Sequence, residues 1–197
     1  MPCKGCWTCS SNPMSAPERE HESPAERLFF ALWPDDALRR QLTQCRDALA
    51  ARAGGRPVSA ENLHLTLAFL GRTDGRQRAC VEAMADALHC PPFALLLNRS
   101  GYWPRPRVLW IGPAVMPEAL IRLAAALRSG AEGCGLKLDA SPYRAHITLL
   151  RKLARPAQAA ACPPLNWPVD RFVLVRSRTL PEGVEYEVVR EWGLGRG

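Results

Sequence analysis

The sequence lacks long hydrophobic runs and several motifs that are typical of common enzyme classes. No apolar stretch approaches the roughly 20 residues that a membrane-spanning helix needs, and no secretion signal is recognisable near the N-terminus. The patterns Gly-x-x-x-x-Gly-Lys, Gly-x-Gly-x-x-Gly and Gly-x-Ser-x-Gly are all absent. We therefore expect a cytoplasmic protein that does not contact membranes and has neither a glycine-rich phosphate loop nor a serine nucleophile elbow.

Acidic residues are fewer than basic ones. The chain has 19 Asp and Glu against 26 Lys and Arg, which gives a formal net charge of +7 and a pI of about 9.2. This balance favours an anionic partner, and nucleic acid is the commonest of these. At 197 residues the chain can form one domain, or two small lobes that share a core.

The cysteines show no regular disulfide spacing. Cys3, Cys6 and Cys9 could supply three thiolates to zinc or an iron–sulfur cluster, but no fourth cysteine follows them. We expect the other five to be reduced thiols: Cys45, Cys80, Cys90, Cys134 and Cys162. Residues 1–25 have too little apolar periodicity to build a core, so we expect a disordered tail there and a folded domain over residues 26–197, with no metal or cofactor.

Apolar periodicity in the folded domain predicts alternating strands and helices. The predicted strands cover residues 27–33, 62–71, 92–103, 107–113, 143–150, 170–180 and 184–192. Helices are expected after Asp35 or Asp36, from about Asp74 to Leu88, and from Pro117 to Gly133. The first of these helices places Leu38, Leu42, Cys45 and Leu49 on one face.

The pattern His-x-Thr-Leu occurs twice, at His64 and at His146, in a chain with only four histidines. Two-residue periodicity places each histidine on the same strand face as its threonine, Thr66 or Thr148. On the same reasoning Ala68 and Leu70 share the face of His64, whereas Phe69 points into the core. A single His-x-Thr is more simply read as a cross-strand pair or a half-buried histidine.

Repetition of the surrounding sequence favours a functional interpretation of both motifs. "FFALWP" precedes an amphipathic helix and the His64 strand, and "VLWIGP" precedes an amphipathic helix and the His146 strand. The separations are similar, with 30 residues from Pro34 to His64 and 33 from Pro113 to His146. A weak internal duplication is plausible, and two lobes related by a pseudo-twofold axis would face their histidines across a cleft.

Two imidazoles and two hydroxyls together suit displacement at a phosphodiester. With an unperturbed pKa near 6.5, one imidazole can accept a proton from the attacking oxygen while the other protonates the leaving oxygen. Hydroxyl donors and an arginine can hold the non-bridging phosphoryl oxygens as negative charge develops. None of these roles requires a metal ion.

The chain resembles the two-histidine phosphoesterases, and specifically the bacterial RNA 2′,3′-cyclic phosphodiesterases also known as 2′-5′ RNA ligases. The resemblance covers nearly all of residues 27–194 and is carried by "RLFFALWPDDALR", "ENLHLTLAFLG", "YWPRPRVLWIGP", "HITLLRK" and "YEVVREWGL". It implies an α+β, bilobal and pseudo-symmetric fold, with two antiparallel sheets flanked by helices and a central cleft. It further implies an enzyme that opens a terminal RNA 2′,3′-cyclic phosphate to a 2′-phosphate and can reversibly form 2′-5′ linkages. We expect the protein to be a monomer.

The resemblance also implies roles for individual residues. Transferred by position, His64 is the general acid, His146 the general base, and Thr66, Thr148 and Arg151 bind the phosphate, while Phe69 stacks on a base. On a straight strand Arg151 has the wrong parity to share a face with His146, so it reaches the site only if the strand bends or ends there. Two alternatives stay open: the same site acting on a small cyclic nucleotide, and an RNA-binding module without turnover.

Overall fold

The computed structural model describes residues 25–154, 162–181 and 183–195. Within them, antiparallel strands form one large sheet with the order β10-β9-β1-β3-β7-β6-β5, and β2 pairs with β7 beside it. The strands of this sheet are β1 (Glu26–Leu32), β2 (Arg56–Pro57), β3 (Leu65–Thr73), β5 (Arg99–Trp103), β6 (Val108–Gly112), β7 (Ile147–Arg151), β9 (Arg171–Leu180) and β10 (Gly183–Gly193). Strands β4 (Phe93–Leu97) and β8 (Leu165–Val169) form a separate pair.

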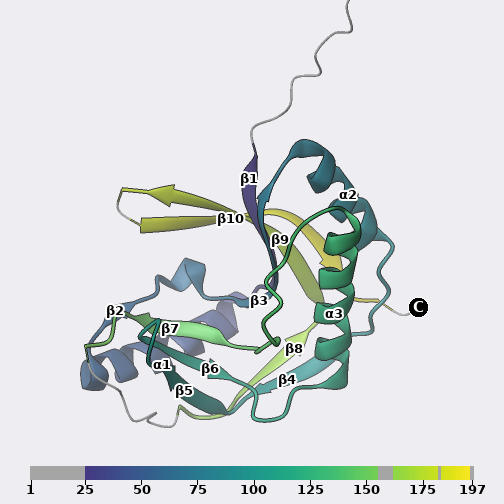
Figure 1. Cartoon of the computed structure of the whole chain (residues 1–197). Coiled ribbons are helices and arrows are strands. Elements are labelled where there is room, and N and C mark those ends of the chain that lie inside the picture. Colours follow the sequence, from purple (N-terminus) through teal and green to yellow (C-terminus); the bar gives the residue numbers. More distant parts are fainter. Residues whose placement is uncertain (1–24, 155–161, 182, 196–197) are drawn as a thin grey trace, which may run out of the picture.

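In the described part of the chain, three α-helices pack on the strands: α1 (Asp36–Ala53), α2 (Gly75–Asp86) and α3 (Glu118–Gly133). Asp35 caps α1 because its carboxylate accepts from the Leu38 amide at 2.8 Å, and the four apolar residues predicted for one face of this helix are buried. Asp74 and Gln77 form a capping box at the start of α2. Helices α2 and α3 lie side by side, and α1 lies beside β2 and β7 (Figure 1).

One predicted strand, residues 92–103, is wrong as a single element. It divides at Asn98 into β4 and β5, because the Asn98 amide donates to the Gly112 carbonyl and its side-chain oxygen accepts from the Ala114 amide. The sequence also gave no sign of β8, the partner of β4. Its Pro168 reads as a strand breaker, yet β8 tolerates it because a two-stranded sheet leaves every strand with a free edge.

A β-bulge reverses the predicted side-chain parity in β3. Phe30 pairs with Ala68 but Ala31 pairs with Thr66, so Leu67 is the extra residue between them. Leu67 and Ala68 are therefore both buried, and Phe69 returns to the face of Thr66, where its side chain is 62% exposed. The predictions that Phe69 points into the core and that Ala68 shares the face of His64 were wrong, because they assumed a regular pleat.

A second bulge, in β7, settles the parity of Arg151. Leu109 pairs with Leu150 and Trp110 pairs with Thr148, which leaves Leu149 as the extra residue. Leu149 and Leu150 are both fully buried, and Arg151 is exposed on the face of Thr148. Each His-x-Thr segment is thus followed by a bulge that brings the fifth residue after its histidine onto the functional face.

The prediction of reduced thiols was wrong for four cysteines. Cys45 of α1 is bonded to Cys162, and Cys80 of α2 is bonded to Cys134 at the end of α3, whereas Cys90 is free. The partners are 117 and 54 residues apart in sequence, so only the folded chain brings their Cα atoms to 5.7 and 5.8 Å. Cys3, Cys6 and Cys9 lie outside the described residues.

Reduction of these disulfides should destabilise the protein. Loops of this length give about 4 kcal/mol each in the chain-entropy account, and engineered examples often give less, so we expect the Cys80–Cys134 bond to contribute about 3 kcal/mol. In thermal unfolding, Cys80→Ser should lower the Tm by roughly 6–12 °C, and a phosphine reductant, which breaks both disulfides, should lower it further. Cys90→Ser, which breaks neither bond, should leave the Tm unchanged. Equal Tm values in both conditions would contradict the pairing.

Candidate active site

The two histidines lie on adjacent chain segments at the centre of the sheet. Each immediately precedes a central strand, and β3 pairs with β7 through Leu65 and Ile147, the residues that follow His64 and His146. A cavity of about 220 Å³, the histidine cavity, lies against both. All six predicted site residues line it: His64, Thr66, Phe69, His146, Thr148 and Arg151. The rest of its lining consists of Val58, Asn62, Trp103, Pro106, Val108 and Tyr186.

Both imidazoles are oriented in the same way. Nδ1 of His64 lies 2.7 Å from the Asn62 carbonyl oxygen, and Nδ1 of His146 lies 2.8 Å from the Arg144 carbonyl oxygen. Since a carbonyl only accepts, Nδ1 carries the proton in each neutral ring and Nε2 is left as the acceptor. The Thr66 hydroxyl, 3.1 Å from Nε2 of His64, donates to it. Each histidine therefore uses the carbonyl two residues before it to fix its tautomer.

Burial lowers the pKa of both imidazoles. The pKa of His64 falls to about 4, mainly because the ring is desolvated, while the Asn62 carbonyl opposes the shift and the charges of Arg151 and His146 add to it. The pKa of His146 is also lowered, first by burial and then by Arg151, against the effect of the Arg144 carbonyl. Both rings are neutral at pH 7 in the unliganded protein.

Aromatic side chains cause much of this burial, and none of them was among the site residues predicted from the sequence. Trp33 stacks on the His64 ring at 5.6 Å, and Phe29 and Tyr186 lie at 4.9 and 5.0 Å from it. The Trp103 ring meets the His146 ring edge-on at 4.4 Å. Trp33 and Trp103 both stand at strand ends, in "FALWP" and "GYWP", and this repeated Trp-Pro was the available signal.

Two further features help to fix the site. The Tyr143 hydroxyl donates a hydrogen bond to the Thr66 carbonyl at 3.3 Å. This bond links β3 to the segment that immediately precedes His146. Arg151, in the histidine cavity, carries a charge that lowers the pKa of both imidazoles. A guanidinium beside two hydroxyls can bind a phosphate through two hydrogen bonds at once.

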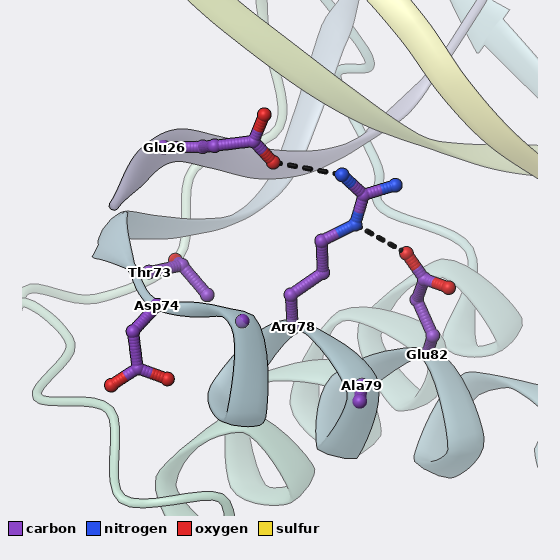
Figure 2. A pocket seen from close by; sticks show the side chains of 7 residues that line it. Glu26, Thr73, Asp74, Arg78, Ala79 and Glu82 are labelled. Atoms are coloured by element: carbon purple, nitrogen blue, oxygen red, sulfur yellow. Dashed lines mark hydrogen bonds and ion pairs between the residues drawn. The ribbon is translucent and has the colours of Figure 1, made fainter. Parts of the chain in front are cut away.

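Another cavity, of about 390 Å³, lies between β1 and the start of α2. Arg78 occupies it with its guanidinium between the carboxylates of Glu26 and Glu82, each at 2.8 Å (Figure 2). Arg176 also pairs with Glu26, and Arg190 with Glu82. Because these charges already neutralise one another, we interpret the cluster as an ion-pair network that ties α2 to the sheet.

In the part of the chain that the structure describes, no group of three or more His, Cys, Asp or Glu side chains is arranged to hold a metal ion. Nor does any helix of that part have the length and apolar character needed to cross a membrane.

An antiparallel α+β fold that brings two His-x-Thr segments to one cavity defines the class of two-histidine phosphoesterases. The profile of the 2′-5′ RNA ligase superfamily matches residues 34–180, and the chain belongs to this family. It is 37% identical over 176 residues to the RNA 2′,3′-cyclic phosphodiesterase of Escherichia coli (strain K12), covering 87% of this chain and 98% of that protein. The enzyme of the same name from Thermus thermophilus is 34% identical, with coverage of 85% and 90%.

Solved structures agree with this assignment. The apo form of E. coli LigT superposes with a TM-score of 0.79 at 35% identity, covering 88% of this chain and all of that one. LigT complexed with 3′-AMP gives the same TM-score and identity, covering 87% of this chain and 99% of that one. The resemblance inferred from the sequence, and the antiparallel α+β fold, are thereby confirmed.

Proposed function

We propose that this protein hydrolyses the 2′,3′-cyclic phosphate at an RNA end to a 2′-phosphate, by acid–base catalysis with His64 and His146 and without a metal ion. The observation that carries the proposal is the pairing of two imidazoles of fixed tautomer in one cavity. The name shared by the E. coli and Thermus relatives supports the substrate, and the complex of LigT with 3′-AMP supports a nucleotide in the site.

Each residue of the histidine cavity has a role in this reaction. His146 accepts a proton from the attacking water, and His64 donates a proton to O3′ as the P–O3′ bond breaks. Thr66, Thr148 and Arg151 stabilise the non-bridging oxygens as charge develops on phosphorus. Phe69, exposed at the cavity, stacks on the terminal base. One proton enters the site from water and one leaves on O3′, so the total charge of the histidine pair is unchanged, and proton exchange with solvent returns the proton from His146 to His64.

The arrangement of strands supports a duplicated origin for the site. The strand order β1-β3-β7-β6 is equivalent from either end, since β1–α1–β3 and β6–α3–β7 each form an antiparallel pair connected through a helix. We propose that these units are two lobes whose histidines face each other across a cleft. Reversible 2′-5′ ligation, a monomeric state and a cytoplasmic location belong to the same proposal.

The direct test is incubation with an RNA oligonucleotide that ends in a 2′,3′-cyclic phosphate, with and without a strong chelator. We expect the mass to rise by one water in both conditions, because the histidines, threonines and Arg151 supply every role in the step. Nuclease mapping should place the phosphate on O2′. Binding without a mass change would favour the RNA-binding alternative, loss of activity with chelator would end the metal-independent proposal, and a 3′-phosphate would overturn the assignment of the leaving oxygen.

The pH dependence should be a bell displaced toward acid. Activity requires one protonated and one neutral imidazole, so kcat/KM must fall below the pKa of His64, about 4, where both rings are charged. It must also fall above the pKa of His146, which lies below 6.5, because both rings are then neutral. We expect a maximum between these values and, at pH 8, a kcat/KM at least about tenfold below it. A plateau that extends to pH 9 would contradict this pair of pKa values.

A further inference from the structure

A third cavity adjoins the histidine cavity. It has a volume of about 360 Å³ and shares one wall with it, the indole of Trp103. The Trp103 ring centroid lies 4.4 Å from that of His146 and 5.2 Å from that of Trp110, which lines only the third cavity. We name this space the arginine cavity after Arg99 and Arg144, which also line it. The indole of Trp103 thus belongs to the walls of both cavities.

The arginines of this cavity are available to a ligand. Both side chains are exposed, and across residues 25–154, 162–181 and 183–195 neither guanidinium is held in an ion pair or a side-chain hydrogen bond. Most other arginines near acidic groups are paired, as Arg78 and Arg190 are. Two unpaired guanidinium groups at one cavity favour an anion, and a phosphate fits their planar donor geometry best.

The aromatic wall is fixed in place and carries an unused donor. Trp110 stands opposite Gly101 in the β5–β6 pair, and a Cβ on residue 101 would collide with its ring, so the glycine makes room for the indole. Nε1 of Trp110 is buried and has no hydrogen-bond partner among the described residues. Aromatic rings beside arginines are the means by which proteins bind single-stranded nucleic acid, through base stacking and phosphate contacts.

We propose that the arginine cavity binds the nucleotide that precedes the cyclic-phosphate end of the RNA substrate. Its base packs against the indoles of Trp103 and Trp110, and the phosphodiester that joins it to the terminal nucleotide is bound by Arg99 and Arg144. The inference rests on the proposed function and deepens it, because it assigns a binding site to the second nucleotide of the RNA end. At about 220 Å³ the histidine cavity is smaller than the ~300 Å³ typical of ligand pockets, so an RNA whose cyclic phosphate lies there must extend beyond it.

The test compares two substrates on one set of variants. The substrates are cytidine 2′,3′-cyclic phosphate and the dinucleotide adenylyl-(3′-5′)-cytidine 2′,3′-cyclic phosphate. The wild type should have a kcat/KM at least about tenfold higher for the dinucleotide. Arg99→Ala should lower the dinucleotide value about tenfold and change the mononucleotide value less than about twofold, and Arg99→Lys should restore part of the loss. Arg122→Ala removes the same charge from α3, lines neither cavity and should change neither value.

The outcomes separate this proposal from the proposed function. A wild type that hydrolyses neither substrate refutes the proposed function itself. Hydrolysis of both at equal kcat/KM, or an Arg99→Ala variant that keeps the wild-type Tm and loses activity equally on both, overturns the second-nucleotide site. Because the mononucleotide rate of Arg99→Ala also reports its folded fraction, misfolding would appear as an equal loss that thermal unfolding identifies. Arg99→Lys then decides the result, since a dinucleotide-specific loss in this variant supports the site and its absence overturns it.

Discussion

Alanine in place of either histidine of the cavity should lower kcat/KM for a cyclic-phosphate RNA by at least about 10²-fold, the usual loss when a general acid or base is removed. Among the described residues no other histidine can replace His64 or His146 at the site, because His89 is exposed on another segment and its ring contacts the Ala87 carbonyl. The double variant should lose little more than either single one if the two rings act in one concerted step. Hydrolysis of the terminal phosphate by each variant is the measurement.

Controls must distinguish lost chemistry from lost structure. His89→Ala removes an exposed imidazole and should keep full activity. His64 packs against Trp33, Phe29 and Tyr186, so His64→Ala also leaves a gap among these rings. His64→Gln fills more of that space and should be equally inactive with a Tm closer to the wild type. Full activity in either His64 variant or in His146→Ala would end the two-histidine mechanism.

The pattern of apolar residues was enough to predict most of the fold. Strands and helices follow the 2.0 and 3.6 periodicities because one face of each is buried, as the four buried residues of α1 illustrate. Edges and breaks were harder to predict. Asn98 divides a continuous apolar stretch through hydrogen bonds to Gly112 and Ala114, residues that reach it only after the chain has folded.

The candidate site was predicted only as far as a regular strand allows. Spacing placed Thr66 beside His64 and Thr148 beside His146. Phe69 and Arg151 were assigned from the family resemblance against the expected parity, and the bulges explain how both reach the cavity. A bulge depends on the register of the partner strand, which no local pattern encodes.

The aromatic residues around the histidines show a second limit of the sequence. Trp33 directly follows β1, whereas Tyr186 lies far along the chain on β10. Both contact His64 only because the folded sheet places β10, β9, β1 and β3 in succession. Their effect is electrostatic, since by excluding water they lower the pKa of His64 far below that of a free imidazole. This displacement of pKa could not be expected from a motif.

The assignment of acid and base can be tested with a substrate in which sulfur replaces O3′. Under the proposed function His64 protonates O3′, and a thiolate leaves without such help because thiols are far stronger acids than alcohols. The sulfur substrate should therefore restore most of the activity lost in His64→Gln, so this variant should hydrolyse the sulfur substrate about 10²-fold faster than the oxygen substrate. It should not rescue His146→Ala, which lacks the group that activates water. Release of the 3′ thiol, followed with a thiol reagent, measures the rate.

The pKa values give this experiment its significance. In the unliganded protein His64 has a pKa of about 4, so a state with His64 protonated and His146 neutral is a minority at neutral pH. Binding of the anionic phosphate favours the cationic ring and raises its pKa, which makes that state accessible when substrate is present. If the sulfur substrate instead rescues His146→Ala and not His64→Gln, the roles are reversed: His146 is then the acid, and the burial of His64 serves to keep a neutral base ready for water.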